Sequence, residues 1–329
     1  MDTGAFSAAL QERVEHAECA LSALLPLPAR QPAVLHESMR YSALGGGKRL
    51  RAVLLMESAA LVGDVRPPAA FATGEELVHV TPEVMRRVGA APAAAAAVEM
   101  VHAFSLVHDD LPCMDDDDFR RGKPTNHKVF GEGIAVLAGD ALLARAFEVL
   151  ARLPWAGVDP TTAVLVSGEL ATAVGSGGLI GGQVADLQSE GALAAAPLSR
   201  TGELERTLEY IHAHKTGALF VASLRMGGLI GGMNERELDR ITAFGRSVGL
   251  AFQIVDDILD IEGDAGVMGK RVGTDARRGK LTYPALFGVD ASRRRVREEL
   301  ELALAAIEPF GERAAFLSAL AQMMAFRRS

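Results

Sequence analysis

Two clusters of aspartate are the residues in this sequence best suited to chemistry, one near the middle of the chain and one far beyond it. Together they comprise Asp109, Asp110, Asp115, Asp116, Asp117 and Asp118, followed by Asp256, Asp257 and Asp260. Carboxylates this close together repel one another unless a cation neutralises them. Because all these donors are oxygen atoms, the expected cation is Mg²⁺, Mn²⁺ or Ca²⁺ rather than zinc.

The spacing inside each cluster predicts how its carboxylates are arranged. Asp256 and Asp260 are four residues apart, which places both on one face of a helix, with Asp257 beside them. Pro112 disfavours helix at the residue before it, so we expect a bend from which Asp115 curls back toward Asp109. The loop pattern of an EF-hand is missing, and Mg²⁺ commonly completes its coordination with water and substrate phosphates. The alternative, in which each cluster is a solvated loop, is weakened because both clusters follow apolar helical stretches.

Basic residues lie close to the first cluster and after a glycine-rich turn. Arg120, Arg121 and Lys123 follow the acid directly, and residues 45–47 are three glycines that lead into Lys48-Arg49-Leu50-Arg51. This turn lacks the spacing of a P-loop, but backbone amides and guanidinium groups bind anions well. Metal-binding acid beside anion-binding cations predicts a diphosphate held by Mg²⁺ on one side and by Lys and Arg on the other.

The elements that must position these residues have helical periodicity. Apolar residues recur at steps of three and four in residues 98–109, in residues 134–153, from Leu204 onward and from Glu237 to Phe252. We therefore predict an all-α protein, a single large helical bundle forming one domain over residues 1–329. A short strand is considered at residues 76–81. Glycine and proline predict a long loop with one helical turn at residues 63–92, further loops at 191–202 and 263–284, and a kinked or closely packed helix at 175–182.

Composition excludes several classes of function. The chain has 329 residues, 49% hydrophobic and 23% charged, as in an ordinary globular protein. Its net charge of -8 argues against nucleic-acid binding. Two cysteines make no disulfide framework, which is typical of a reducing compartment. The sequence predicts neither a membrane span nor a signal peptide, so we expect a cytoplasmic protein.

From residue 41 to residue 288 the sequence resembles the short-chain trans-isoprenyl diphosphate synthases, the polyprenyl synthetase family that includes bacterial farnesyl and geranylgeranyl diphosphate synthases. The segments that carry the resemblance are GGKRLR (46–51), HDDLPCMDDDDFRRGKPTNHK (108–128), LAGDALL (137–143), GGQVADL (181–187), HKTGAL (214–219), FQIVDDILD (252–260) and GKLTYP (279–284). The resemblance implies an isoprenoid synthase fold, a helical bundle around a deep central cavity, in a homodimer.

The implied activity is a Mg²⁺-dependent prenyl transfer. Isopentenyl diphosphate would be joined head-to-tail to dimethylallyl or geranyl diphosphate by ionisation, condensation and elimination, giving farnesyl diphosphate. Geranylgeranyl diphosphate synthase is the first alternative. A class I terpene cyclase or a non-catalytic prenyl synthase subunit is more distant, because a cyclase normally carries an Asn/Ser/Glu motif where residues 256–260 read DDILD.

The resemblance also implies roles for individual residues. The ligands of three Mg²⁺ would be Asp109, Asp110, Asp115, Asp256, Asp257 and Asp260. The allylic diphosphate would bind Arg120, Lys215, Lys270 and Lys280. Isopentenyl diphosphate would bind Lys48, Arg51, His102 and Arg121. Lys215, Thr216 and Gln253 would line the reacting carbon as catalytic residues. Without the resemblance, His102 reads as a core histidine and Gln253 as a helix-bridging amide. Arg327 and Arg328 are expected to be solvated, and the alternative is a basic tail that covers the site.

Product length depends on Phe104 and Ser105, which the resemblance places at the floor of the cavity. A bulky ring five residues before Asp109 with a small residue after it is similar to the bacterial farnesyl type, so a fifteen-carbon product is expected. Against this, residues 113–132 also resemble twenty-carbon synthases of plants and cyanobacteria, which tend to have a smaller residue at the position of Phe104.

Overall fold

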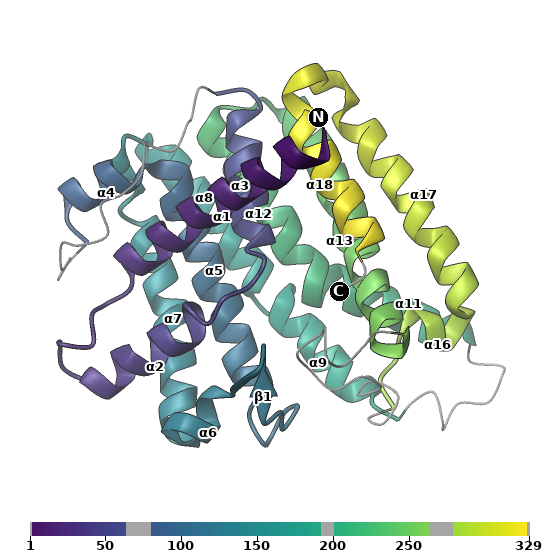
Figure 1. Ribbon diagram of the computed structural model, residues 1–329, viewed down its shortest axis with the longest axis horizontal. Helices are drawn as coiled ribbons and strands as arrows, with labels where there is room; N and C mark the ends of the chain where they lie inside the picture. Colours follow the sequence, from purple (N-terminus) through teal and green to yellow (C-terminus); the bar gives the residue numbers. More distant parts are fainter. Residues whose placement is uncertain (1, 64–79, 192–200, 263–278, 328–329) are drawn as a thin grey trace. The chain divides into compact units, whose positions relative to one another are not determined.

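The computed structural model describes residues 2–63, 80–191, 201–262 and 279–327. These residues are overwhelmingly helical (Figure 1), and their only β structure is a hairpin of β1 (Phe119–Arg120) and β2 (Lys123–Pro124). The all-α prediction is confirmed. Parts of all three predicted loops (64–79, 192–200 and 263–278) lie outside the described residues, as do most of the strand considered at 76–81, Lys270 and Arg328.

Contacts divide the chain into two compact units, Met1–Leu170 with Ser223–Met233, and Ala171–Ala222 with Asn234–Ser329. The helices of the first unit are α1 (Thr3–Leu24), α2 (Ala33–Ala43), α3 (Leu50–Ala60), α4 (Pro82–Val88), α5 (Ala90–Asp109), α6 (Asn126–Phe130), α7 (Glu132–Leu150) and the short η1 (Leu153–Ala156). Those of the second are α9 (Leu179–Ser189), α11 (Thr201–Ile211), η3 (His212–Gly217), α13 (Glu235–Glu262), α16 (Tyr283–Phe287), α17 (Val289–Ile307), η4 (Glu308–Ala314) and α18 (Ala315–Phe326). Two helices, α8 (Pro160–Val174) and α12 (Ala218–Gly231), have residues in both units. The single domain expected over 1–329 stays a prediction.

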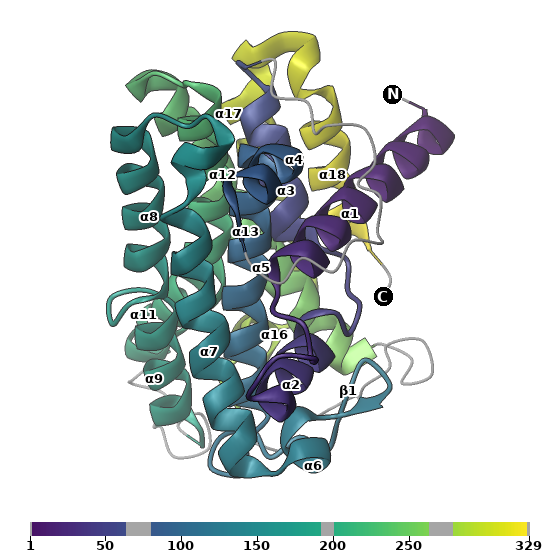
Figure 2. The same cartoon turned by 90° about the vertical axis from the view of Figure 1, so that its left-hand side faces the viewer.

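Helix α5 forms the centre of the first unit. It packs against α1, α3 and α7 (Figure 2), and Ala93–Ala97 have no exposed surface. Small side chains let the neighbouring helices approach closely, and Met100 and Val101 fill the space beyond them. The first aspartate cluster begins at the end of this buried helix, so its position is set by the core.

The structure corrects three sequence predictions of element boundaries. Helix α5 begins at Ala90 rather than near Val98, because Pro92 lies in the first turn, where a missing amide costs nothing. The helical turn expected within 63–92 is the seven-residue helix α4, longer than one turn, and Thr81 before it accepts a hydrogen bond from the Val84 amide at 3.2 Å. Residues 175–178 separate α8 from α9 instead of kinking one helix, whereas the predicted close packing is confirmed at Gly182 in α9, where a Cβ would lie 2.2 Å from the Lys215 amide nitrogen.

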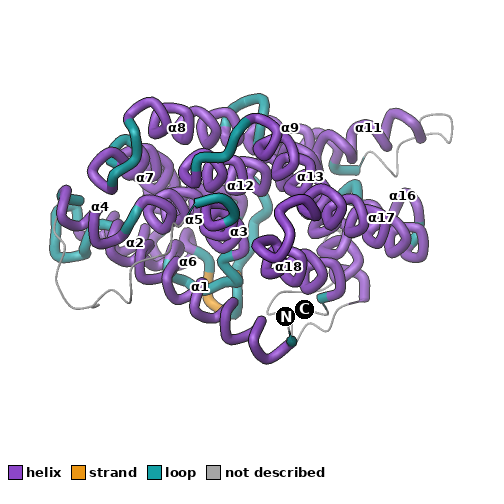
Figure 3. The backbone as a smooth tube through the Cα atoms, turned by 90° about the horizontal axis from the view of Figure 1, so that it is seen from above, coloured by secondary structure: helices purple, strands orange, loops and turns teal. Residues whose placement is uncertain are grey.

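Helix α13 forms the centre of the second unit. Its apolar stripe includes Ile241, Phe244 and Val248, all buried, as the three-and-four spacing predicts, and Phe252 at the end of the predicted stripe is partly buried. The helix packs against η3, α16, α17 and α18, and Figure 3 shows α13, α17 and α18 beside one another. The second aspartate cluster lies in the last two turns of α13, so it too is carried by a core helix.

Two segments in the described residues are long and apolar enough to cross a membrane by length and composition alone. Ala90–Asp109 is 83% buried, as expected of a core helix, and Pro160–Ser189 is 39% buried. This is weak evidence for a membrane span, because buried helices of globular proteins meet the same criteria.

Candidate functional site

The first aspartate cluster folds into the bend that the sequence predicts. Helix α5 ends at Asp109, and the Asp115 amide donates a hydrogen bond back to the Asp109 carbonyl at 2.8 Å. The amides of Met114 and Asp116 both donate to the Leu111 carbonyl, at 2.9 and 3.0 Å. These bonds bring the backbones of Asp109 and Asp115 together, and both side chains are partly exposed to solvent.

Asp110 has a different environment from its neighbour Asp109. Its side chain is buried, and Arg120 grips it with Nε at 2.8 Å from Oδ1 and Nη2 at 2.6 Å from the same oxygen. Burial raises the pKa of Asp110, and the guanidinium only partly offsets that effect. Asp110 is therefore placed to hold Arg120 in one orientation. From the sequence alone this role could not be distinguished from the predicted role of a metal ligand.

The Asp110–Arg120 pair is presented by the β1–β2 hairpin. Its two connecting residues, Arg121 and Gly122, have φ values of 53° and 75°, as a tight two-residue turn requires. A cavity of about 50 Å³ lies beside this hairpin, lined in part by Asp110, Arg120 and Arg121. The hairpin thus brings two of the predicted diphosphate-binding arginines to one edge of the first unit.

The glycine-rich turn before α3 meets the same hairpin. Arg121 donates a hydrogen bond from Nη1 to the Gly46 carbonyl. A Cβ atom at Gly47 would lie 2.7 Å from that Nη1, and its φ of +135° also disfavours a side chain. The backbone conformation therefore favours glycine at this position, and exposed Lys48 follows directly.

Arg51 and His102 lie together, as the isopentenyl diphosphate assignment requires. Arg51 Nη1 is 3.4 Å from His102 Nε2. Burial, followed by the charges of Arg51, Arg121, Arg120 and Arg49, holds the pKa of His102 well below its ordinary value of 6.5. The ring is therefore neutral at pH 7, and the arginines around it form a strongly positive region suited to an anion.

Sequence reasoning missed the residue that supports this region. Arg49, at the start of α3, is buried with φ 47°, and it pairs with Glu18 at 2.6 Å and Glu99 at 3.1 Å. Glu99 also accepts a hydrogen bond from the Ala52 amide at 3.2 Å. This network anchors the start of α3, and with it Lys48 and Arg51. The sequence signal for this network was Glu99, a charged residue within the apolar stretch of α5.

The two predicted floor residues lie on α5 one turn before the aspartates. Phe104 is buried, and its ring packs edge-to-face on His108 with centroids 4.9 Å apart. Ser105 donates from Oγ to the His102 carbonyl at 2.9 Å. Their role in product length stays a prediction.

In the second unit, Lys215 and Thr216 lie on η3, a short π-helix between α11 and α12. Wide turns of this kind occur often at functional sites. Lys215 Nζ lies 2.6 Å from Asp186 Oδ2, and Lys280 Nζ lies 3.7 Å from the same oxygen. Burial would raise the pKa of Asp186, but the two lysines outweigh it and lower that pKa. Asp186, on α9, is a second residue that the sequence analysis did not single out.

A hydrogen-bonded chain connects the other predicted catalytic residues. Thr216 Oγ1 donates to Gln253 Oε1 at 2.7 Å, and Gln253 Nε2 donates to Asp257 Oδ1 at 2.9 Å. Asp257 is buried, and its Oδ2 accepts from the Tyr283 amide at 3.0 Å and lies 3.4 Å from His212 Nε2. Asp257 therefore joins α13, η3 and α16 through its carboxylate, rather than facing solvent.

Asp256 does not share the contacts of Asp257 and instead pairs with Arg327, near the end of the chain. Arg327 Nη2 lies 3.0 Å from Asp256 Oδ1 and 3.3 Å from the Phe252 carbonyl, and its guanidinium lies 4.0 Å from the centre of the Phe252 ring. The Arg327 side chain is only 10% exposed, so the expectation that it is solvated was wrong. Asp260, one turn after Asp256, is buried.

Among the described residues, no three His, Cys, Asp or Glu side chains gather into a self-contained metal site. The donor chemistry still fits Mg²⁺, because this ion commonly takes one or two carboxylates and completes its shell with phosphate and water. Asp109 and Asp115 in the first unit, and Asp256 in the second, are the partly exposed carboxylates suited to it. In the second unit, the buried amide of Gln183 on α9 has no hydrogen-bond partner among the described residues at either end, as expected of a group that meets a ligand.

Comparisons with known proteins agree with this chemistry. A family model described as polyprenyl synthetase matches residues 32–321. The chain is 46% identical over 301 residues to the chloroplastic geranylgeranyl pyrophosphate synthase of Catharanthus roseus, covering 91% of this chain and 75% of that protein. It is 43% identical over 318 residues to a dimethylallyltranstransferase of Fischerella ambigua, covering 97% and 82%. The apo crystal structure of an FPP/GFPP synthase from Zymomonas mobilis matches with a TM-score of 0.79 at 34% identity, covering 98% of this chain and 100% of that one.

Proposed function

Because the chain belongs to the polyprenyl synthetase family and has the all-α fold of that family's solved members, we propose that this trans-prenyltransferase makes farnesyl diphosphate from isopentenyl diphosphate and an allylic diphosphate. One observation supports this proposal above the others. Arg51, Arg121 and a neutral His102 form an anion-binding region in the same unit as the Asp109–Asp115 bend. A two-diphosphate reaction needs such a second anion site, whereas a cyclase with one diphosphate substrate does not.

The described residues have distinct tasks in this reaction. Lys48, Arg51 and Arg121 bind isopentenyl diphosphate, while Arg120 and Lys215 bind the allylic diphosphate. Asp110 and Asp186 hold those two cations in place. Asp109, Asp115 and Asp256 are the carboxylates that would hold Mg²⁺, which supplies Lewis-acid stabilisation of the leaving diphosphate when bound. Lys270, with the same assignment as Lys280, lies outside the described residues.

The reacting carbon becomes positive when the allylic C–O bond breaks. Thr216 and Gln253 offer oxygen atoms that stabilise positive charge, and their mutual hydrogen bond at 2.7 Å fixes both side chains. The alkene of isopentenyl diphosphate then forms the new C–C bond, and a proton leaves the resulting cation. We assign no side-chain base, and the released diphosphate is the expected proton acceptor.

A product assay tests this function. Purified protein is incubated with Mg²⁺, isopentenyl diphosphate and either dimethylallyl or geranyl diphosphate, and the dephosphorylated products are separated by chromatography. We expect farnesol as the main product from both starters. Asp115→Asn should lower turnover by about a hundredfold or more, whereas Asp239→Asn, at an exposed position of α13, should leave it unchanged. A cyclised hydrocarbon formed without consumption of isopentenyl diphosphate would contradict the proposal.

A twenty-carbon product is the second candidate and is at least as well supported, because most of the similar curated proteins are named geranylgeranyl pyrophosphate synthases. The buried ring of Phe104 supports the shorter product. Replacing it in steps, Phe104→Met and then Phe104→Ala, should lengthen the main product progressively as volume is removed. Phe220→Met, at a fully buried ring of the second unit, is the matched control and should leave the product distribution as it is. An unchanged distribution in both Phe104 variants would refute its role as a floor.

We also propose a homodimer. Val136 and Leu137 on α7, and Val164 and Leu165 on α8, are exposed apolar residues, and Figures 2 and 3 both place α8 beside α7. Exposed apolar residues gathered on adjacent helices are typical of a surface covered by another subunit.

A further inference from the structure

The first unit contains a larger cavity that shares no residue with the candidate site. It has a volume of about 610 Å³, and it lies among the residues after α1, helix α2, the second half of α7 and Val80. Arg145, one of its lining residues, comes nine residues after Val136, whose carbonyl contacts His108 beside the aspartate bend. At about 1.5 Å per residue, this is about 13 Å along α7. The cavity is therefore separate from the Asp109–Asp115 bend.

The charged groups of this cavity favour an anion. Arg30, Arg145 and Arg152 line it, together with one carboxylate, Glu148. The lining thus carries a formal charge of about +2 in a chain whose net charge is -8. Three guanidinium groups around one cavity of an acidic protein offer more donors than a single carboxylate can use, since each guanidinium carries five N–H donors.

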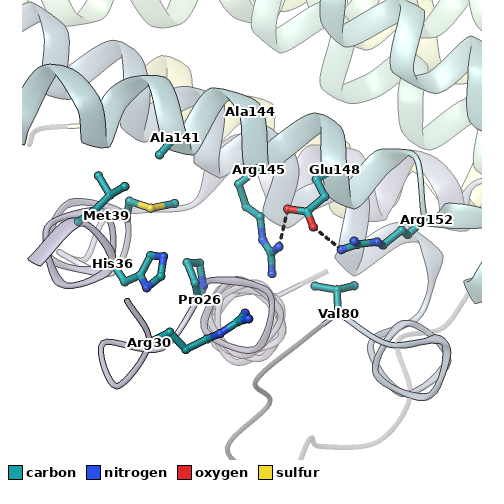
Figure 4. Close-up of a pocket in the computed structure, with 11 residues that line it drawn as sticks. Pro26, Arg30, His36, Met39, Val80, Ala141, Ala144, Arg145, Glu148 and Arg152 are labelled. Atoms are coloured by element: carbon teal, nitrogen blue, oxygen red, sulfur yellow. Dashed lines mark hydrogen bonds and ion pairs between the residues drawn. The ribbon is translucent and has the colours of Figure 1, made fainter. Parts of the chain in front are cut away.

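The structure holds two of these guanidinium groups in fixed positions. Arg145 Nε donates to the Leu24 carbonyl at 2.8 Å, and its Nη1 donates to Glu148. Arg152 Nη1 lies 2.6 Å from the other oxygen of Glu148, and its guanidinium lies 5.4 Å from the centre of the Trp155 ring. Figure 4 shows the two arginines converging on Glu148. Cations that are already oriented lose little freedom when they bind a ligand.

The remaining wall is apolar, with one polar group. Leu35, Met39 and Val80 line it, along with His36, whose buried Nδ1 has no hydrogen-bond partner among the described residues. Figure 4 shows His36 and Met39 across the cavity from Arg152. A volume near 610 Å³ is typical of a small-molecule site. The lining thus combines guanidinium groups with apolar side chains.

From this lining we propose a second, non-catalytic site for an organic phosphate with a short apolar tail. Arg30, Arg145 and Arg152 would bind the phosphate, and Leu35, Met39 and Val80 would pack against the tail. The inference does not rest on the proposed catalytic function, because none of these residues belongs to the candidate active site.

The experiment uses Trp155, the single tryptophan of the chain, as a local reporter of Arg152. Octyl phosphate is titrated into the full-length protein in EDTA, which removes any metal-dependent binding, and tryptophan fluorescence is followed. We expect a saturable change, with inorganic phosphate producing the same change at higher concentration and octanol producing none. Arg30→Ala should weaken octyl phosphate binding by about tenfold, the loss expected for one charge-assisted contact.

Controls separate this site from general charge effects and from the active site. Arg86→Ala, at an exposed position of α4, makes the same charge change outside the cavity and should bind octyl phosphate as the wild type does. Arg152→Ala, measured by equilibrium dialysis because it alters the reporter, should also weaken binding by about tenfold. Arg30→Ala should keep wild-type turnover and product length. A signal that does not saturate, equal binding of octanol, or equal weakening by Arg86→Ala would overturn the proposal.

Discussion

Neighbouring aspartates in the second cluster differ in what surrounds them, and their variants should differ accordingly. Asp256 is partly exposed beside Arg327, whereas Asp257 is buried and accepts hydrogen bonds from Gln253 and the Tyr283 amide. Asp257→Asn should lower the free energy of unfolding by about 1–3 kcal/mol, because an amide cannot replace both acceptor oxygens. It should reduce kcat without changing the Mg²⁺ concentration needed for half-maximal activity.

Asp256→Asn is the matched variant, with the same change one residue earlier. It should leave the melting temperature close to that of the wild type and raise the Mg²⁺ requirement. Denaturant unfolding and Mg²⁺ titration of activity measure the two effects separately. If Asp257→Asn raised the Mg²⁺ requirement as much as Asp256→Asn, Asp257 would be a metal ligand, as the sequence analysis expected, and not a positioning residue.

His102 makes the stability of the ligand-free protein depend on pH. Its folded-state pKa is held below the ordinary 6.5 by burial and by the surrounding arginines. Between these two values the unfolded chain binds the proton and the folded chain does not, so stability falls as pH drops below 6.5, by at most about 1.4 kcal/mol per pH unit. The loss stops once pH falls below the folded-state pKa.

His102→Asn removes this contribution while keeping a polar group. Urea unfolding at about pH 7 and about pH 5 should therefore show a smaller drop for the variant than for the wild type. Comparing the two proteins cancels the titration of the other histidines. An identical drop in both proteins would show that the ring is protonated in the folded state.

Contacts between residues could be predicted from the sequence only where the residues are close together in the chain or belong to a specific motif. The return of Asp115 to Asp109 followed from Pro112, and the pairing of Arg51 with His102 followed from the resemblance. The Asp110–Arg120 and Asp186–Lys215 ion pairs could not be predicted, because spacing alone does not distinguish a carboxylate that binds metal from one that orients a cation.

At the scale of elements, the close approach of α9 to η3 positions Lys215. A Cβ atom at Gly182 would lie 2.2 Å from the Lys215 amide nitrogen, a backbone atom that cannot move aside alone. Gly182→Ala should therefore push the two elements apart, lower stability by about 1–3 kcal/mol and reduce turnover.

Gly168→Ala is the matched control, because an added Cβ there meets nothing within 4 Å in the middle of α8. It should stabilise the protein by about 0.5–1 kcal/mol, since alanine restricts the unfolded chain more than glycine does. Thermal unfolding and an activity assay distinguish the pair. A Gly182→Ala variant as stable and active as Gly168→Ala would show that the contact of α9 with η3 is not needed.

Element types were predicted better than element ends. The stripes on α7 and α13 have the expected period, because each helix buries one face. Helix α5 is buried all round, so its first two turns carry no stripe, and the alanines and Pro92 obscured its start. The break between α8 and α9 depends on the backbone at Gly178, where a Cβ would lie 2.2 Å from the Ala173 carbonyl oxygen.

At the scale of the whole molecule, the exposed apolar residues of α7 and α8 predict the oligomeric state. Leu137 and Val164 are 54% and 71% exposed, which is unfavourable in water unless another subunit covers them. Leu137→Glu with Val164→Glu should convert a dimer into a monomer in sedimentation equilibrium. Thr161→Glu, at an exposed polar position of α8, is the control and should remain dimeric. A wild-type protein that sediments as a monomer would contradict the proposed homodimer.

We propose that carboxylates from both aspartate clusters serve one Mg²⁺-dependent condensation. The most direct measurement is the incorporation of labelled isopentenyl diphosphate as a function of Mg²⁺ concentration, in the wild type, Asp109→Asn, Asp256→Asn and the exposed control Asp239→Asn. The account predicts no incorporation in EDTA, a wild-type Mg²⁺ curve for Asp239→Asn, and a raised Mg²⁺ requirement with lower maximal turnover for both cluster variants. Wild-type Mg²⁺ curves for Asp109→Asn or Asp256→Asn would contradict it.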